Sequence, residues 1–302
     1  MPMITKLPLY PGPRIARRTP AGWDDRPYTL FTVRPLGVTI GAEISDISLA
    51  EPLSPTVQAE LNRALLEWKV LFFRDQHLTR EQHAAFAANW GELEDHPFIR
   101  LHTSQPKAAE VVRLEKGPEA KGVENFWHSD VTWREAPSLG SVLQAIELPE
   151  YGGDTLFADM GAAYDCLPGE VKGLIDDMVA VHDWINTFGR GMKPEVREAL
   201  RPDFPAVEHP VVRTHPETGR KTLYVNRAFT QHIVGLDGDE STRLLEYLYL
   251  QAMLPEFQVR FTWTPGALAF WDNRSTQHYA VSDYYPQRRV MERITIVGDR
   301  PY

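Results

Sequence analysis

The chain has 302 residues, of which 43% are apolar and 24% are charged. This length and composition are typical of a globular protein with one large domain or two modest ones, and they exclude a disordered or fibrous chain. The net charge of −9 argues against nucleic-acid and anionic-membrane partners. The single cysteine, Cys166, allows no internal disulfide. It favours a reducing compartment, so we expect a cytoplasmic protein without a membrane span.

The first predicted feature is an irregular arm. Residues 1–28 contain six prolines and scattered basic residues. This composition disfavours helices and strands. We therefore expect a proline-rich N-terminal arm at 1–28 and a single domain at 29–302. Apolar residues that alternate over 31–40 predict a strand or hairpin at the start of this domain.

Two helices are predicted next. Ser54 followed by Pro55 is typical of a helix start, and apolar residues continue at helical spacing to Trp68. A short apolar run at 70–73 predicts a buried strand. Thr79 and Gln82 have the spacing of a capping box, which predicts a helix ending near residue 90.

The rest of the chain is rich in predicted strands. Helical patterns cover only 167–179 and 239–253. Many strands without a regular alternation with helices predict an antiparallel sandwich or barrel with helices outside. Runs of β-branched and aromatic residues between Gly, Pro and Asn/Asp breaks predict strands at 142–148, 154–158, 208–214, 221–226, 259–264, 267–271 and 289–297.

A candidate metal site lies in the sequence Trp127-His128-Ser129-Asp130. On a strand, residues two apart point to the same face, so His128 and Asp130 could bind one ion together. A carboxylate with two histidines forms the facial triad of non-haem Fe(II) oxygenases. With ten histidines, one His-x-Asp is expected about half the time by chance, so this motif alone does not establish a metal site.

Two further patterns lie near the C-terminus. An apolar stretch from Phe270 runs into polar residues and then His278, where a third ligand could complete the site. Arg289 and Arg293 are four residues apart on one predicted strand and so share a face. Two buried arginines on one face would each need an anion. The alternative is a solvent-facing pair of arginines, with Val290, Ile294 and Ile296 as the buried face, and the pattern alone favours neither.

These motifs together resemble one family closely. The chain resembles the Fe(II)- and 2-oxoglutarate-dependent dioxygenases of the taurine dioxygenase group, which also contains alkylsulfatases and aryloxyacetate dioxygenases. The resemblance runs from about residue 31 to residue 301. Its motifs are Trp127-His128-Ser129-Asp130-Val131-Thr132, Gly152-Gly153-Asp154-Thr155, His209-Pro210-Val211-Val212-Arg213-Thr214-His215-Pro216, Trp271-Asp272-Asn273-Arg274, Gln277-His278-Tyr279-Ala280 and Gln287-Arg288-Arg289.

The resemblance implies the fold and the cofactor site. The family fold is a double-stranded β-helix, or jelly roll, mainly β with flanking α-helices, which would make 29–302 a single catalytic dioxygenase domain. It implies iron ligation by His128, Asp130 and His278, with O₂ and 2-oxoglutarate as co-substrates. Thr155 and Arg289 match the positions that bind the distal carboxylate of 2-oxoglutarate. Because Asp130 is retained where related halogenases have a small apolar residue, oxygen transfer is expected.

The resemblance also implies a substrate site. Arg293 matches the arginine that binds a substrate sulfonate, and His96 matches the histidine beside it. The backbone N–H of Val131 would be a further donor, and Phe188 and Phe229 match aromatic residues of the pocket wall. Glu124 falls where the taurine enzyme has an asparagine near the substrate amine, and Ile99 replaces a tyrosine.

These residues imply hydroxylation of the carbon beside the leaving group of a small organic anion. Taurine or a related alkanesulfonate is the leading candidate, releasing sulfite and an aldehyde with succinate and CO₂. An alkyl sulfate or an aryloxyalkanoate is the alternative within the family. A non-oxygenase jelly-roll protein that binds a metal or ligand is the alternative from a different class. By resemblance we also expect a homo-oligomer, a dimer or a tetramer.

Overall fold

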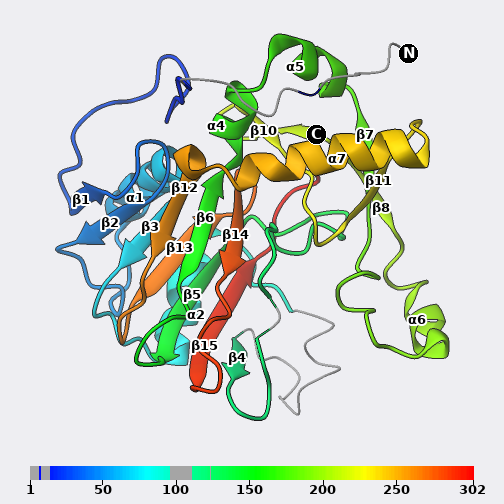
Figure 1. Cartoon of the computed structure of the whole chain (residues 1–302). Helices are drawn as coiled ribbons and strands as arrows, with labels where there is room; N and C mark the ends of the chain where they lie inside the picture. The colour runs from blue at the N-terminus through cyan, green and yellow to red at the C-terminus, as the bar shows by residue number, and fades with distance from the viewer. Residues whose placement is uncertain (1–6, 8–13, 96–110, 123) are drawn as a thin grey trace.

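The computed structural model describes residue 7 and residues 14–95, 111–122 and 124–302 (Figure 1). A seven-stranded sheet forms its centre, and all neighbouring strands in it are antiparallel except β2 and β3. In spatial order its strands are β1 (Thr32–Pro35), β2 (Ala42–Ser45), β3 (Val70–Phe73), β13 (Leu268–Asp272), β5 (Gly140–Glu147), β15 (Arg289–Ile296) and β4 (Val112–Lys116).

A smaller antiparallel sheet packs against this one. It consists of β12 (Gln258–Phe261), β6 (Thr155–Asp159) and β14 (Thr276–Ala280). Apolar side chains from both sheets form one buried cluster between them, in which the rings of Phe72 and Phe261 stack with centroids 4.0 Å apart. Two largely antiparallel sheets packed face to face confirm the predicted jelly roll.

The outer face of the large sheet is covered by α1 (Pro55–Trp68) and α2 (Arg80–Ala87), followed by the 3-10 turn η1 (Ala88–Trp90). Both predicted helix starts are confirmed, since Ser54 accepts from the Val57 N–H and Thr79 forms a complete capping box with Gln82. Strand β3 is therefore buried on both faces. Leu71 contacts the helices and Phe72 contacts the small sheet, which explains the unbroken apolar run.

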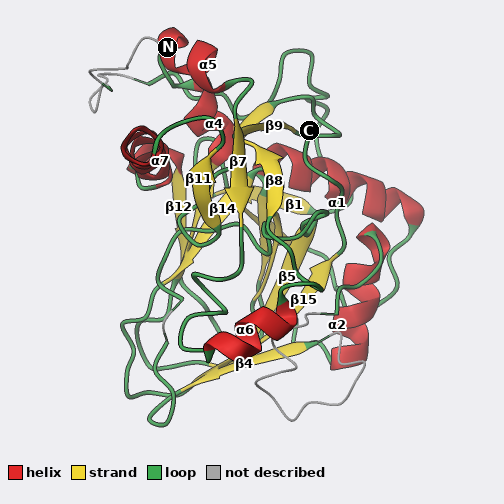
Figure 2. Cartoon of the chain, turned by 90° about the vertical axis from the view of Figure 1, so that its right-hand side faces the viewer, coloured by secondary structure: helices red, strands yellow, loops and turns green. Residues whose placement is uncertain are grey.

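Helices α4 (Met160–Asp165), α5 (Gly169–Ile175) and α7 (Gly238–Ala252) lie at one end of the molecule, and α6 (Pro194–Leu200) lies near the opposite end (Figure 2). A three-stranded sheet contains β11 (Thr230–Ile233), β7 (Val179–His182) and β8 (Val207–Pro210), and a two-stranded sheet contains β9 (Val212–Thr214) and β10 (Lys221–Leu223). Helices α4, α5 and α7 pack with these strands in a second apolar cluster. Helix α6 and the 3-10 turn η2 (Pro255–Phe257) complete the described elements.

Two predicted elements differ from the structure. The helix expected at 167–179 ends at Ile175, and Val179 opens strand β7. The apolar pattern continues at helical spacing through Val171, Ile175 and Val179. The sequence therefore gives no sign that the helix ends before Val179. The strand expected at 208–214 is two strands in different sheets, β8 and β9. The chain changes sheet after Pro210, which has no N–H to donate to a continuing ladder.

Strands β4, β7, β11 and β14 were not predicted. The sequences of β4, β11 and β14 carry many polar residues, whereas β7 was missed because Val179 continues the helical spacing of the segment before it. The described part of the N-terminal arm, residues 14–28, contains no helix or strand. It lies against α1, where Arg18 pairs with Glu67 at 2.8 Å and Tyr28 donates to the same carboxylate. The division into an arm and one domain stays a prediction. Across the described residues, no helix has the length and apolar character that crossing a bilayer requires.

Candidate active site

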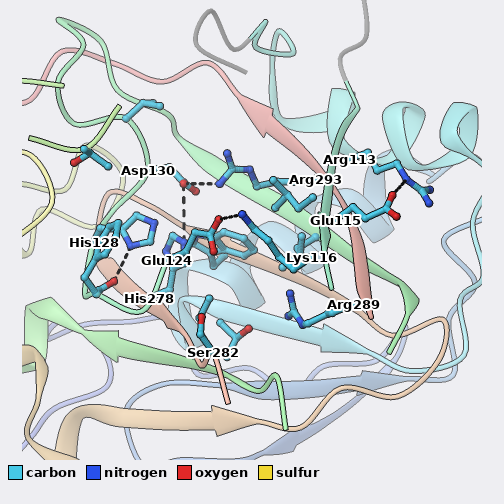
Figure 3. Close-up of a pocket in the computed structure, with 18 of the residues that line it drawn as sticks. Arg113, Glu115, Lys116, Glu124, His128, Asp130, His278, Ser282, Arg289 and Arg293 are labelled. Atoms are coloured by element: carbon cyan, nitrogen blue, oxygen red, sulfur yellow. Dashed lines mark hydrogen bonds and ion pairs between the residues drawn. The ribbon is translucent and has the colours of Figure 1, made fainter. Parts of the chain in front are cut away.

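His128, Asp130 and His278 lie together in the wall of one pocket (Figure 3). Each offers one ligand atom, and these atoms lie within 4.8 Å of one another. Backbone pairing brings two of the segments together, because His128 and His278 exchange N–H···O bonds of 3.1 and 2.8 Å. His278 belongs to β14 of the small sheet. The predicted triad therefore assembles from segments 150 residues apart in the chain.

The local structure around Asp130 corrects the prediction. His128 and Asp130 do not lie on a regular strand: His128 forms an isolated bridge, and residues 130–133 form a turn. Val131 has a φ of 46°, in the left-handed region that a β-branched side chain rarely adopts. This turn, rather than strand alternation, directs Asp130 toward the two histidines.

Side-chain hydrogen bonds orient His128 and Asp130. His128 donates from Nδ1 to the carbonyl of Phe126 at 2.9 Å, which leaves Nε2 as the nitrogen that could bind a metal ion. Asp130 Oδ2 accepts from Ser141 Oγ at 2.7 Å and from Asn273 Nδ2 at 3.3 Å. Its other oxygen, Oδ1, lies 4.0 Å from His278 Nε2. One carboxylate oxygen is thus held by the protein while the other faces the histidines.

The ionisation states suit a divalent cation. Burial lowers the pKa of both imidazoles, that of His278 to about 3, so both are neutral and able to ligate. Burial alone would raise the pKa of Asp130, but Arg293 and the two histidines outweigh it and hold this pKa well below its usual range. Two neutral imidazoles and one carboxylate on one side of a cavity fit the facial triad that binds Fe(II) and leaves coordination positions open.

The residues expected to bind 2-oxoglutarate lie in the same cavity, which has a volume of about 480 Å³. Arg289 of β15 is 8% exposed, and its Nε has no hydrogen-bond partner among the described residues. Thr155 Oγ1 accepts from Trp263 Nε1 at 3.0 Å, so its own proton can go to an anion in the cavity. Gly153 has a φ of +71°, and a Cβ there would lie 3.0 Å from the Arg289 side chain, so this glycine leaves room for the arginine.

Arg293 also points inward, which confirms the inward-facing interpretation of the two arginines. Its guanidinium donates to Asp130 Oδ1 at 2.8 Å, and both arginines line the cavity (Figure 3). The solvent-facing alternative is wrong because β15 is buried on both faces. Ile294 and Ile296 of this strand contact the cluster beneath α1 and α2, while Met291 belongs to the core between the sheets.

The cavity wall contains most of the predicted substrate residues. Val131, Phe188 and Phe229 line it, and the two phenylalanine rings stack with centroids 6.0 Å apart. Glu124 also lines it, with its Oε1 2.7 Å from Lys116 Nζ. His96 and Ile99 lie outside the described residues. The individual roles of these residues in binding stay predictions.

Sequence reasoning missed several neighbours of the site. Ser141 and Asn273 orient Asp130, and Trp271 Nε1 donates to Asn273 Oδ1 at 2.9 Å. Asn273 lies within a family motif, whereas Ser141 has no local signal because it is an ordinary serine at the start of β5. Lys116 and Leu114 line the cavity from β4, a strand that was itself not predicted.

Comparison with known proteins agrees with this geometry. Residues 32–295 match the family described as "Taurine catabolism dioxygenase TauD, TfdA family". The chain is 39% identical to an alkylsulfatase of Acinetobacter baylyi, over 90% of this chain and 87% of the relative. It is 35% identical to an alpha-ketoglutarate-dependent 2,4-dichlorophenoxyacetate dioxygenase of Cupriavidus pinatubonensis, over 88% and 97% of the two chains.

A solved structure gives the same result. The crystal structure of a taurine dioxygenase from Burkholderia xenovorans is 38% identical and superposes with a TM-score of 0.77, covering 90% of this chain and 93% of that one. The alternative of a non-oxygenase binding protein is therefore wrong, because the relatives are dioxygenases and the chain retains the triad. Its cofactors are Fe(II), 2-oxoglutarate and O₂. The chain belongs to the taurine catabolism dioxygenase TauD, TfdA family and is a 2-oxoglutarate-dependent non-haem iron dioxygenase.

Proposed function

We propose that the enzyme hydroxylates the carbon next to the sulfate or sulfonate group of a small alkyl monoanion. The hydroxylated product would break down to an aldehyde and sulfate or sulfite. Fe(II), 2-oxoglutarate and O₂ supply the oxidant when bound, with succinate and CO₂ as co-products. The observation that carries the proposal is the placement of Arg293 in the cavity beside Asp130, with apolar side chains around it.

The formal charges of the site favour a monoanionic substrate. Fe(II) with Asp130 would carry one net positive charge, and Arg289 and Arg293 add one each. The dianion 2-oxoglutarate offsets two of these three charges. A singly charged sulfate, sulfonate or carboxylate would offset the third, next to Arg293. Burying this set of charges without the last anion would leave one cation uncompensated, which is costly in a dry pocket.

The ion pair between Glu124 and Lys116 makes taurine a less favourable candidate substrate. Taurine is a zwitterion, so its ammonium needs an anionic partner within the cavity. Glu124 is the residue expected to supply it, but its carboxylate pairs with Lys116 at 2.7 Å and is 43% exposed. Because this pair is neutral as a unit, it adds no anion for an ammonium group. An alkyl sulfate or an unsubstituted alkanesulfonate fits this pairing better.

Apolar walls support an alkyl chain next to the anion. Leu114, Leu143, Phe188 and Phe229 line the cavity together with the ligand residues. The similarity to an alkylsulfatase and to a sulfate ester dioxygenase points the same way. The stacked pair of Phe188 and Phe229 could also flank an aromatic ring, which keeps an aryloxyalkanoate as the second candidate. His96 and the Val131 N–H are proposed as further donors to the anion.

A substrate panel tests the proposal. Substrate-dependent succinate formation is measured with alkyl sulfates, alkanesulfonates, taurine and aryloxyalkanoates under identical Fe(II) and 2-oxoglutarate. We expect alkyl sulfates or simple alkanesulfonates to give the highest kcat/KM. A clear preference for taurine would show that Glu124 binds the ammonium despite Lys116, and a preference for aryloxyalkanoates would select the second candidate.

Variants of Arg293 identify its ligand. Arg293→Ala should weaken binding of the preferred substrate at least tenfold, because a charge-assisted hydrogen bond contributes roughly 1.5–3 kcal/mol. Binding of 2-oxoglutarate should change little. Equal losses for both ligands would contradict the assignment of Arg293 to the substrate. A cytoplasmic location and a homo-oligomeric state stay predictions.

A further inference from the structure

Two buried histidines outside the metal site hold the turn that carries Asp130. His182 of β7 and His209 of β8 have 0% and 1% of their surface exposed, and their ring centroids lie 5.2 Å apart. The strands pair in antiparallel register, which places both rings over residues 132–134. Neither ring is a metal ligand or lines the described cavity. We call His182 and His209 the histidine pair.

His182 binds the hydroxyl of Thr132. Its Nδ1 lies 3.0 Å from Thr132 Oγ1, which already accepts from Asn226 Nδ2 at 2.9 Å. The other ring nitrogen, Nε2, lies 3.3 Å from Thr230 Oγ1. Either neutral tautomer of His182 satisfies both contacts, because each hydroxyl group can donate or accept. A hydrogen bond at each ring nitrogen therefore fixes the orientation of the ring and connects it to Thr132.

His209 binds the same turn from a second direction. Its Nε2 lies 2.8 Å from the carbonyl oxygen of Arg134 and donates to it. Burial lowers the pKa of His209 to about 4 and that of His182 well below its usual value, so both rings stay neutral. The pair thus fixes the turn at residues 132 and 134, immediately after Asp130.

The turn needs this support because its conformation is unfavourable by itself. Val131 has a φ of 46°, and such backbone strain persists only where the surroundings determine the conformation. On the other side of Val131, the Asp130 N–H donates to Asn273 Oδ1 at 3.2 Å. Contacts on both flanks of Val131 therefore keep the turn in the form that directs the Asp130 carboxylate toward His128 and His278.

We propose that His182 and His209 are positioning residues for the iron site, acting through the Thr132 hydroxyl and the Arg134 carbonyl to hold Asp130 in ligating geometry. Metal affinity then depends on hydrogen bonds that lie outside the ligand set. Changing groups that orient metal ligands typically weakens metal binding about 10- to 100-fold. A role in packing alone would instead lower stability and leave the affinity unchanged.

Measurements of metal affinity and of stability distinguish a positioning role from a role in packing alone. The dissociation constant of Mn(II) is measured by electron paramagnetic resonance on the full-length protein, and the Tm of the metal-free protein is measured in parallel. Thr132→Ser and Thr132→Ala both lose the methyl group and differ only in the hydroxyl. We expect Thr132→Ala to weaken Mn(II) binding at least tenfold and Thr132→Ser to stay within about threefold of the wild type.

Ser241→Ala is the matched control. Ser241 is 2% exposed, and its hydroxyl accepts from the Ile233 N–H at 2.8 Å; neither residue lines the cavity. This variant should lose stability without losing Mn(II) affinity. If Thr132→Ala does not fold, His182→Gln and His182→Leu replace it, since only the glutamine amide can form a hydrogen bond with the Thr132 hydroxyl. Then His182→Gln should bind Mn(II) at least tenfold more tightly than His182→Leu.

Three results would overturn the proposal. The first is wild-type Mn(II) affinity in Thr132→Ala or in His182→Leu. The second is an equal loss of Mn(II) affinity in Thr132→Ser and Thr132→Ala, which would show that the Thr132 hydroxyl does not affect metal binding. The third is a loss of Mn(II) affinity in Ser241→Ala as large as that in Thr132→Ala. This result would show that the affinity falls with stability in general.

Discussion

The Asp130 carboxylate has three kinds of neighbour: hydrogen-bond donors, the histidines of the triad and the guanidinium of Arg293. One oxygen accepts hydrogen bonds from Ser141 and Asn273, and the other faces His278 and the guanidinium of Arg293. In the metal-free protein Arg293 holds the carboxylate ionised. A bound Fe(II) would share that charge, and Arg293 would then attract the substrate anion. If Arg293 binds the substrate as proposed, this contact would couple metal binding to substrate recognition.

The triad residues should be individually required. His128→Ala, Asp130→Ala and His278→Ala should each reduce turnover below detection, because two remaining ligands bind Fe(II) weakly and leave its geometry undefined. Succinate formation with saturating Fe(II) and the Mn(II) dissociation constant measure this. His232→Ala is the control, since His232 is exposed on β11. Near-normal activity in any of the three variants would remove that residue from the ligand set.

Arg289 should determine the affinity for 2-oxoglutarate. Arg289→Ala should raise the 2-oxoglutarate concentration for half-maximal activity at least tenfold, because a charge-assisted contact of roughly 1.5–3 kcal/mol is lost. Arg288→Ala is a matched control. The Arg288 side chain lies on the surface, where it pairs with Glu115 at 2.7 Å and also with Glu147. If Arg288→Ala had the larger effect, the carboxylate would have to bind outside the cavity.

At the scale of elements, β15 gives the site its two arginines and the core its apolar contacts. Arg289, Met291 and Arg293 face inward, and Ile294 and Ile296 face the helices. The helices therefore support the strand that carries the two cavity arginines, Arg289 and Arg293. Arg80 of α2 strengthens this contact through its ion pair with Glu292 of β15 at 2.6 Å.

The cap of α2 should contribute measurably to stability. Thr79→Ala should lower the free energy of unfolding by about 1 kcal/mol, because the side-chain oxygen that accepts from the Gln82 N–H is lost. Thr79→Ser keeps that oxygen and should lose much less. Urea denaturation of the metal-free protein compares the two. Equal losses would show that the threonine methyl group, and not the cap, stabilises this helix.

For the whole molecule, buried histidines predict acid sensitivity. Burial lowers the pKa of His83 and of His209 to about 4 and that of His182 further, so all three are neutral in the folded protein. In the unfolded chain they would titrate near 6.5. The unfolded state therefore binds more protons below pH 6.5, and the unfolding free energy falls as the pH drops from about 6.5 toward 4.

Each fully titrating histidine contributes up to about 1.4 kcal/mol per pH unit in this range. Above pH 6.5 this stabilisation is fully present. Denaturation of the metal-free protein at pH 7.5, 6.0 and 5.0 should show a steep decline between the last two values. His83→Gln should make the decline shallower, and a flat profile in the wild type would contradict the lowered pKa values.

The sequence by itself determined the features that depend on neighbouring residues. Ser54 and Thr79 mark helix starts because a cap needs only the next three residues. The family motifs pointed to His128, Asp130, His278, Thr155 and Arg289, and the structure brings all five to one cavity. Their individual roles toward the cofactors stay predictions.

Only the tertiary structure decided the features that depend on distant partners. The strained turn at Val131 is held by the histidine pair and by Asn273, which lie tens of residues or more than a hundred residues away in the chain. The pairing of Glu124 with Lys116, which changes the expected substrate, depends on β4 joining the edge of the large sheet beside β15. Such contacts have no local pattern, because their geometry and burial exist only after the sheets have packed.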